Sequence, residues 1–320
     1  MKFDPRKLVG PFMALLLFGL AVRLLIGEAH KVSWDDFVAG LTGVPTTYLV
    51  IATFLVALNY CLLICYDILA LRYVCRALPL RRVSLVAFLG YALGNNLGTL
   101  LAAAPIRYRF YHRWGLTHRQ IVALMSVLAL TFWSGVCVLG GVVLVLHPIE
   151  LPAKFDLPFG VRTLGAILLS IAVFYAVICL VWQKPWPIGK LHLRPPSLGL
   201  ATAQASVAIV DLTISATALY LVMPGDAVVP FPTVLAAYLV GITVSLITQV
   251  PGGLGVLELI LWTLLKDTVG KPVLASVLIF RVIYYILPLL VGMVVLVAHE
   301  IYSGAMEARH DAEAFDSTTT

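Results

Sequence analysis

Long apolar stretches separated by short polar segments dominate the chain. Six stretches of about 20 residues have the length of a membrane-spanning helix. They predict single spans at residues 8–27, 46–66, 119–146, 161–182, 199–222 and 273–299. With 61% hydrophobic and only 12% charged residues, the chain carries more apolar surface than one soluble domain can bury. The pattern therefore predicts an all-α polytopic membrane protein.

Two further apolar segments do not fit single spans. Residues 83–118 begin as an apolar helix and then break at Pro105 into a basic run. Residues 233–266 are interrupted by a Pro-Gly-Gly turn at 251–253, and at about 34 residues they are too long for one span and too short for two. We interpret both as re-entrant helical hairpins, which enter the membrane and return to the same side.

The distribution of basic residues favours this topology. Lys and Arg in short loops favour the cytoplasmic side of a membrane. If both segments are re-entrant, fifteen of the 22 Lys and Arg lie on the cytoplasmic side, five lie outside and two lie within spans. If both are simple spans, the split between the two sides is ten to ten. The re-entrant topology also places both termini in the cytoplasm.

The same topology predicts an inverted repeat, with halves at about residues 8–146 and 161–299. Each half contains two spans, a hairpin and a third span, and the two hairpins enter from opposite sides, which is a recurring plan of transporters. We expect residues 1–299 to form one transmembrane domain and residues 300–320 to form a polar, disordered cytoplasmic tail. A faint echo supports the repeat: Asp67, Tyr91-x-x-Gly94 and Pro105 in one half match Asp211, Tyr238-x-x-Gly241 and Pro251 in the other.

The hairpin breaks are the first candidate functional feature. Non-helical backbone survives at membrane depth only where protein or a water-filled cavity satisfies its polar groups. The helix that follows each break presents free N–H groups, which suit an anionic group such as phosphate. We therefore expect Gly252 and Gly253 to line a cavity. The alternative is that these glycines only permit a tight turn.

Arg107 and Arg109 follow the first break immediately. An ionised Arg near the bilayer centre needs a partner, and a guanidinium fork matches a lipid phosphate. We therefore expect both residues to bind phosphate. The alternative is that both extend to the cytoplasmic headgroups and act only as topology anchors.

Four other ionisable residues lie in or at the edge of apolar segments. Asp211, Glu258 and Arg281 either form a buried ion-pair network, or move protons or bind a cationic headgroup. Asp67 ends the second span, where it either joins the functional site or meets Arg72 at the membrane surface.

Polar side chains also lie inside two apolar segments. Asn95 and Asn96 lie in the first limb of the first hairpin, among glycines at four-residue spacing that allow close helix approach. Tyr284, beside Arg281 in the last span, either lines a cavity or packs against other aromatic side chains. The seven histidines show no metal-binding spacing, and no nucleotide loop or catalytic motif is present. We therefore expect no metal, no cofactor and no enzymatic activity.

Several strings resemble those of a known family. The resemblance is to the lysyl-phosphatidylglycerol synthase transmembrane region, which is the flippase domain of the bacterial multiple peptide resistance factor and of its stand-alone relatives. The matching strings lie at residues 94–98, 105–111, 115–117, 250–258 and 280–288.

The resemblance implies a multi-pass protein of the bacterial cytoplasmic (inner) membrane. In the two-domain members, this region moves aminoacylated phosphatidylglycerol from the inner to the outer leaflet. The positions here that look equivalent to important charged positions of the family are Asp67, Arg107 or Arg109, Asp211 and Glu258. The soluble transferase domain of those members is missing here, so we do not expect this chain to make the lipid.

The leading hypothesis is a lipid flippase or scramblase-like transporter that moves a phospholipid between leaflets. An alternative is a non-enzymatic membrane partner that presents lipid to a separately encoded synthase or glycosyltransferase. A membrane enzyme acting on lipid phosphates is a weaker option, because no nucleophile is paired with a base. The basic residues lie between apolar blocks rather than in one patch, so nucleic acid is not an expected partner.

Overall fold

The fold is known from a computed structural model, and the predicted span at residues 8–27 lies outside the residues that it describes. Those residues are 41–149, 160–182, 184, 186–188, 191–224, 229–248, 250–270 and 272–317.

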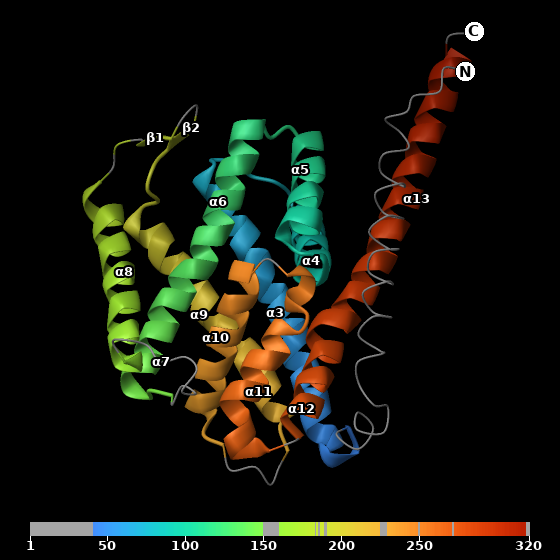
Figure 1. Cartoon of the computed structure of the whole chain (residues 1–320). Helices are drawn as coiled ribbons and strands as arrows, with labels where there is room; N and C mark the ends of the chain where they lie inside the picture. Colours follow the sequence, from blue (N-terminus) through green and yellow to red (C-terminus); the bar gives the residue numbers. More distant parts are fainter. Residues whose placement is uncertain are drawn as a thin grey trace.

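Within these ranges the chain is helical apart from one short antiparallel β-hairpin (Figure 1). The α-helices are α3 (Thr46–Tyr73), α4 (Leu80–Leu97), α5 (Ala104–Arg113), α6 (His118–Gly135), α7 (Gly141–Leu146), α8 (Val161–Val181), α9 (Leu198–Leu221), α10 (Phe231–Thr248), α11 (Val256–Val269), α12 (Pro272–Arg281) and α13 (Leu287–Ser317). The strands are β1 (Trp186–Ile188) and β2 (Leu191–Leu193). Short π-helical turns are η2 (Thr99–Ala103), η3 (Val136–Gly140) and η6 (Val282–Ile286), and η5 (Pro251–Gly253) is a 3₁₀ turn.

Six helices in this part of the chain are long and apolar enough to cross a membrane, judged by length and composition. They are Thr46–Tyr73, His118–Leu146, Val161–Val181, Leu198–Leu221, Phe231–Thr248 and Pro272–Tyr302. Five of them coincide with predicted spans. The sixth is α10, which the sequence analysis assigned to one limb of a hairpin. The prediction of a helical protein with several candidate membrane spans is therefore confirmed.

Helix α8 presents a largely apolar surface to the outside of the bundle. Gly165 and Cys179 are its only buried residues, although the helix is almost entirely apolar. Phe174 is 67% exposed and Val181 is 72% exposed. Such an apolar surface is covered by acyl chains when the helix lies in a bilayer. Helices α3 and α9 instead pack along each other at the centre of the bundle.

The first expected hairpin is present as a pair of antiparallel helices, but its break was misplaced. The chain turns at Gly98, where φ is +91° and ψ is 157°, a conformation that is essentially restricted to glycine. Pro105 does not break the chain, because Ala103 and Ala104 before it are in the right-handed helical region and the π-helical turn η2 leads directly into α5. A local π-helical adjustment tolerates a residue without an N–H. The two limbs pack closely, since a Cβ placed on Gly94 would lie 2.7 Å from the Cβ of Ala103.

Helices α10 and α11 form the second pair, and its break lies where the sequence predicts. Gly252 in the turn has a φ of +63°, in the left-handed region. A Cβ on Gly241 would lie 2.8 Å from Leu257, so these limbs also approach closely. The two helix pairs extend from opposite ends of the bundle, and their turns meet inside it (Figure 1). A Cβ on Gly252 would lie 2.9 Å from the carbonyl oxygen of Asn96.

The expectation of a disordered tail at residues 300–320 was wrong for most of that segment. Helix α13 continues to Ser317 and extends beyond the bundle (Figure 1). Residues 303–317 include four Ala and two Glu. These residues favour a helix even without tertiary packing, which accounts for the difference.

Candidate functional site

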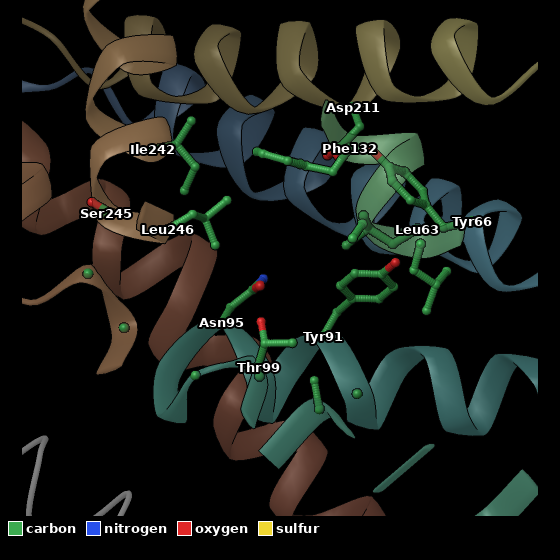
Figure 2. A pocket seen from close by; sticks show the side chains of 18 of the residues that line it. Leu63, Tyr66, Tyr91, Asn95, Thr99, Phe132, Asp211, Ile242, Ser245 and Leu246 are labelled. Atoms are coloured by element: carbon green, nitrogen blue, oxygen red, sulfur yellow. Dashed lines mark hydrogen bonds between the residues drawn. The ribbon is translucent and has the colours of Figure 1, made fainter. Parts of the chain in front are cut away.

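A cavity of about 440 Å³ lies where the turns of the two helix pairs meet the central helices (Figure 2). Residues from α3, α4, α5, α6, α9 and α10 line it, together with both turns and η6. Gly252 and Gly253 are among the lining residues, as the sequence analysis expected. The breaks in the helices therefore border a hollow.

The cavity has a polar wall on α4 and a mixed wall on α6, α9 and α10. Tyr91 and Asn95 of α4 lie opposite Phe132 and Ile242, and Asp211 and Ser245 lie beside these two apolar side chains (Figure 2). Two of the apolar lining residues are open to the outside, since Leu100 is 72% exposed and Trp133 is 36% exposed. The cavity therefore opens towards the apolar surroundings of the bundle.

Arg107 lies on the cavity wall and pairs with Asp67, not with a ligand. Its Nε donates to Asp67 Oδ1 at 3.1 Å and its Nη2 donates to Asp67 Oδ2 at 2.9 Å. The hydroxyl of Tyr111 donates to the same carboxylate at 2.7 Å. The Asp67 side chain is completely buried, so Asp67 joins the site and does not meet Arg72 at the membrane surface.

Residues of α4 also contact the Arg107 guanidinium. The group lies over the ring of Tyr91, with 4.6 Å between Cζ and the ring centroid. A Cβ on Gly90 would lie 2.8 Å from Arg107 Nη1, so only glycine leaves room for the group. Nη1 makes no hydrogen bond within the described part of the chain. It remains available to a ligand in the cavity.

Arg109 lies elsewhere. Its Nη1 is 2.7 Å from Glu300 Oε1, and its Nη2 donates to Glu300 Oε2 at 2.9 Å. The residue does not line the cavity. Of the two arginines expected to bind phosphate, the structure therefore brings only Arg107 to the cavity, and it joins Arg109 to α13.

Asp211 also lines the cavity and is 5% exposed. The hydroxyl of Tyr66 donates to its Oδ2 at 2.7 Å. Unlike Asp67, it forms no ion pair with any residue that the structure describes. It is therefore not part of an ion-pair network with Glu258 and Arg281.

Glu258 and Arg281 do pair with each other, and Arg281 fixes the second turn. Arg281 Nη2 donates to Glu258 Oε2 at 2.8 Å and to the carbonyl oxygen of Gly253 at 3.0 Å. Its Nη1 donates to the carbonyl oxygen of Gly252 at 3.2 Å. Glu258 also accepts from the backbone N–H of Gly255 at 2.9 Å. The ion-pair alternative thus describes these two residues, although Asp211 stays outside it.

The two asparagines connect the first helix pair to the rest of the bundle. Asn95 lines the cavity, and its Nδ2 donates to the hydroxyl of Tyr60 at 3.4 Å. Asn96 Nδ2 donates to the carbonyl oxygens of Ala92 at 2.9 Å and of Tyr285 at 3.0 Å. The second of these acceptors lies in the π-helical turn η6, so Asn96 joins α4 to the last span.

Tyr284 lines the cavity and also joins a buried polar cluster behind it. Asn59 Nδ2 donates to Ser215 Oγ at 2.7 Å and to the Tyr284 hydroxyl at 3.2 Å. Ser215 Oγ donates to the same hydroxyl at 3.2 Å. These contacts lie among otherwise apolar helices.

Several polar residues of the site were not predicted from the sequence as site residues. Polar residues in the middle of apolar spans were one available signal, and the matching Tyr-x-x-Gly strings were another. The missed residues are Asn59, Tyr60, Tyr66, Tyr91, Tyr111, Ser215 and Tyr238. In the described ranges, no three His, Cys, Asp or Glu side chains are grouped so that they could hold a metal ion.

The chain has relatives of matching length. The protein slr0712 of Synechocystis sp. is 33% identical over 307 residues, which cover 95% of each chain. The inner membrane protein YbhN of Escherichia coli is 30% identical over 316 residues, which cover 97% of this chain and 99% of YbhN. No family model matches the chain.

A weaker similarity relates the chain to a larger enzyme. The phosphatidylglycerol lysyltransferase of Staphylococcus haemolyticus is 23% identical over 286 residues. The match covers 88% of this chain but only 33% of the lysyltransferase. It agrees with a distant relation to the membrane region that the sequence strings resemble.

Proposed function

Because the chain belongs to the family of the inner membrane protein YbhN, we propose that it is a multi-pass protein of the bacterial inner membrane that moves a phospholipid between leaflets. It acts as a flippase or scramblase-like transporter and is not an enzyme. The observation that carries the proposal is the cavity at the junction of the two helix turns, which is lined by both polar and apolar side chains. A phospholipid likewise combines a polar headgroup with apolar acyl chains.

The polar wall suits the headgroup phosphate. Arg107 Nη1 is free of protein partners in the described residues, and the fork of Arg107 is held in place by Asp67. The helical segment that begins at Thr99 borders the same region, because both Thr99 and Leu100 line the cavity. A volume of about 440 Å³ falls within the range of small-molecule sites.

The apolar lining residues suit the acyl chains. Leu100 and Trp133 are exposed residues of the cavity lining, to which Phe132 and Leu246 also belong. A lipid placed with its head at Arg107 can keep its chains in the surrounding bilayer. Only the headgroup then crosses the membrane through protein, which is the costly part of lipid movement.

Two re-entrant hairpins arranged as an inverted repeat are part of the proposal. In support, the second limbs are short: α11 has 14 residues, or about 21 Å, against a hydrocarbon core of about 30 Å. The paired glycines Gly94 and Gly241 each allow their returning limb to approach. The distribution of Lys and Arg supports cytoplasmic termini.

The candidate lipid is phosphatidylglycerol or its aminoacylated form. The similarity to the lysyltransferase covers 88% of this chain and gives the reason for testing these lipids first. Asp211 offers the cavity a carboxylate without an ion-pair partner in the described residues, which suits the amine of an aminoacyl group.

Reconstitution into liposomes tests the proposal. We expect the wild type to move fluorescent phosphatidylglycerol between leaflets, measured with a membrane-impermeant quencher. Arg107→Ala should slow movement about ten- to hundredfold, the value of a charged hydrogen bond. Arg109→Ala is the matched control, because it removes an arginine of the same helix that lies outside the cavity.

Two outcomes would count against transport. Arg107→Ala leaves Asp67 buried without its partner, so the variant Asp67→Asn/Arg107→Gln provides a neutral pair in case the single variant does not fold. Equal rates for the wild type, this double variant and protein-free liposomes would contradict transport. Recovery of a bound synthase or glycosyltransferase without lipid movement would favour the role of a partner that presents lipid to that enzyme.

A further inference from the structure

Three carboxylates lie in the interior around the cavity, and they differ in how their charge is compensated. Asp67 is paired with Arg107, and Glu258 is paired with Arg281. Asp211 has no basic partner in the described ranges. It accepts a hydrogen bond from the hydroxyl of Tyr66, and the polar side chains of Asn59 and Ser215 also lie near its carboxylate. An unpaired carboxylate at membrane depth is costly when it is ionised. Asp211 therefore accepts a proton more readily than Asp67 and Glu258, whose charges are paired.

The groups that face Asp211 carry no positive charge. Tyrosines surround it: Tyr60 and Tyr66 from α3, Tyr91 from α4, Tyr238 from α10 and Tyr284 from η6. Arg107 of α5 lines the same cavity, but its charge is compensated by Asp67. Helix α6 contributes only the uncharged side chains Met125, Leu128, Ala129, Phe132 and Trp133 to the cavity.

A hydrogen-bonded cluster begins one helical turn from Asp211. Ser215 follows Asp211 by four residues on α9, and its Oγ donates to the hydroxyl of Tyr284. The hydroxyl of Tyr60 donates to the carbonyl oxygen of Tyr284 at 3.2 Å. Asn59 Oδ1 is buried and has no partner among the described residues. Polar groups therefore extend from the cavity into the bundle. Among them, Asn59 Oδ1 can accept a hydrogen bond from water.

We propose that Asp211 is the proton-binding residue that couples lipid movement to a proton gradient. The inference rests on the proposed function and adds its energy source. In each cycle, hydronium entering from one side transfers a proton to the Asp211 carboxylate and becomes water. The new O–H bond breaks when water from the other side accepts the proton. A proton suits the site better than a metal cation, which requires several oxygen ligands.

The test uses the full chain in liposomes that contain fluorescent phosphatidylglycerol and carry an imposed pH gradient. For the wild type, we expect the steady-state distribution of the probe between leaflets to shift with the direction of the gradient. One proton per lipid and one pH unit correspond to at most about a tenfold change in the ratio. An entrapped pH-sensitive dye should report proton movement with the lipid.

Variants of Asp211 identify the residue. Asp211→Asn should abolish the response to the gradient, and Asp211→Glu should retain it. Asp267→Asn is the matched control, because it makes the same change at an exposed position of α11. If Asp211→Asn does not fold, Tyr66→Phe provides a second test: the pH midpoint of transport should move to higher pH, because the ionised carboxylate loses its hydroxyl donor.

The outcomes separate this inference from the proposed function. Lipid movement that ignores the pH gradient in the wild type would overturn coupling and leave transport intact. An unchanged response in Asp211→Asn would overturn the role of this residue, and movement driven by a sodium gradient would replace the proton with a cation. No lipid movement under any condition would overturn both proposals.

Discussion

The two arginine–carboxylate pairs in the interior use the same chemistry for different purposes. Arg281 donates to the carbonyl oxygens of Gly252 and Gly253 as well as to Glu258, so it fixes the turn between α10 and α11. Arg107 instead joins two separate elements, α5 and α3, and keeps one nitrogen free of protein partners in the described residues.

The difference shows that the partners of a buried arginine, rather than its depth, decide what it can do. A guanidinium whose donors are used by backbone carbonyls is a structural clamp. One that is held by a single carboxylate, with another face on a cavity, is positioned to bind an anion. The two roles can be distinguished by the stability of variants in which each ion pair is broken.

The largest effect is expected when the fully buried pair is broken. Asp67→Ala removes the only ion-pair partner that Arg107 has in the described ranges and leaves the Tyr111 hydroxyl without its acceptor. We expect a loss of about 3–5 kcal/mol in the free energy of unfolding. Denaturant unfolding in detergent measures it. The neutral variant Asp67→Asn/Arg107→Gln should recover most of the loss, and failure to recover would mean that the charge itself stabilises the fold.

A smaller loss, of about 2–3 kcal/mol, is expected for Arg281→Ala. The Glu258 side chain is 15% exposed, so water can partly replace the lost partner. The effect should be local, and hydrogen exchange should increase in the turn at residues 250–255. Arg281→Lys is the control: it keeps the charge but not the fork, so it should restore only part of the protection. Uniform loosening of the whole bundle would contradict the role of a clamp.

The smallest effect is expected for the pair that lies outside the cavity. The side chains of Arg109 and Glu300 are 25% and 14% exposed. Partly exposed pairs contribute little, so Arg109→Ala should cost at most about 1 kcal/mol by the same unfolding measurement. A cost as large as that of Asp67→Ala would show that α5 depends on α13 for its position.

Much of the architecture follows from the sequence, because span length and apolar composition are local properties. The two helix pairs were also predictable, since no single span fits their length. The position of the first turn was not: Pro105 is the more obvious helix breaker, but the π-helical turn before it accommodates the proline, and Gly98 supplies the required conformation.

The charged residues of the site were predictable, but its other polar residues and the pairings were not. The sequence singles out Asp67, Arg107 and Asp211 as charges within apolar segments. Which carboxylate meets which arginine depends on how distant helices pack, and that information is not local. For the same reason, Arg109 could not be separated from Arg107, although one faces α13 and the other faces the cavity.

The most direct test of the account is to locate a phospholipid on the protein. We would incorporate a phosphatidylglycerol with a photoreactive headgroup into liposomes with the wild-type chain and map the adducts by mass spectrometry. The account predicts adducts on cavity residues such as Thr99 and Asn95, with fewer in Arg107→Ala. Adducts confined to the outer surface, such as α8, and unchanged in Arg107→Ala, would contradict a headgroup site in the cavity.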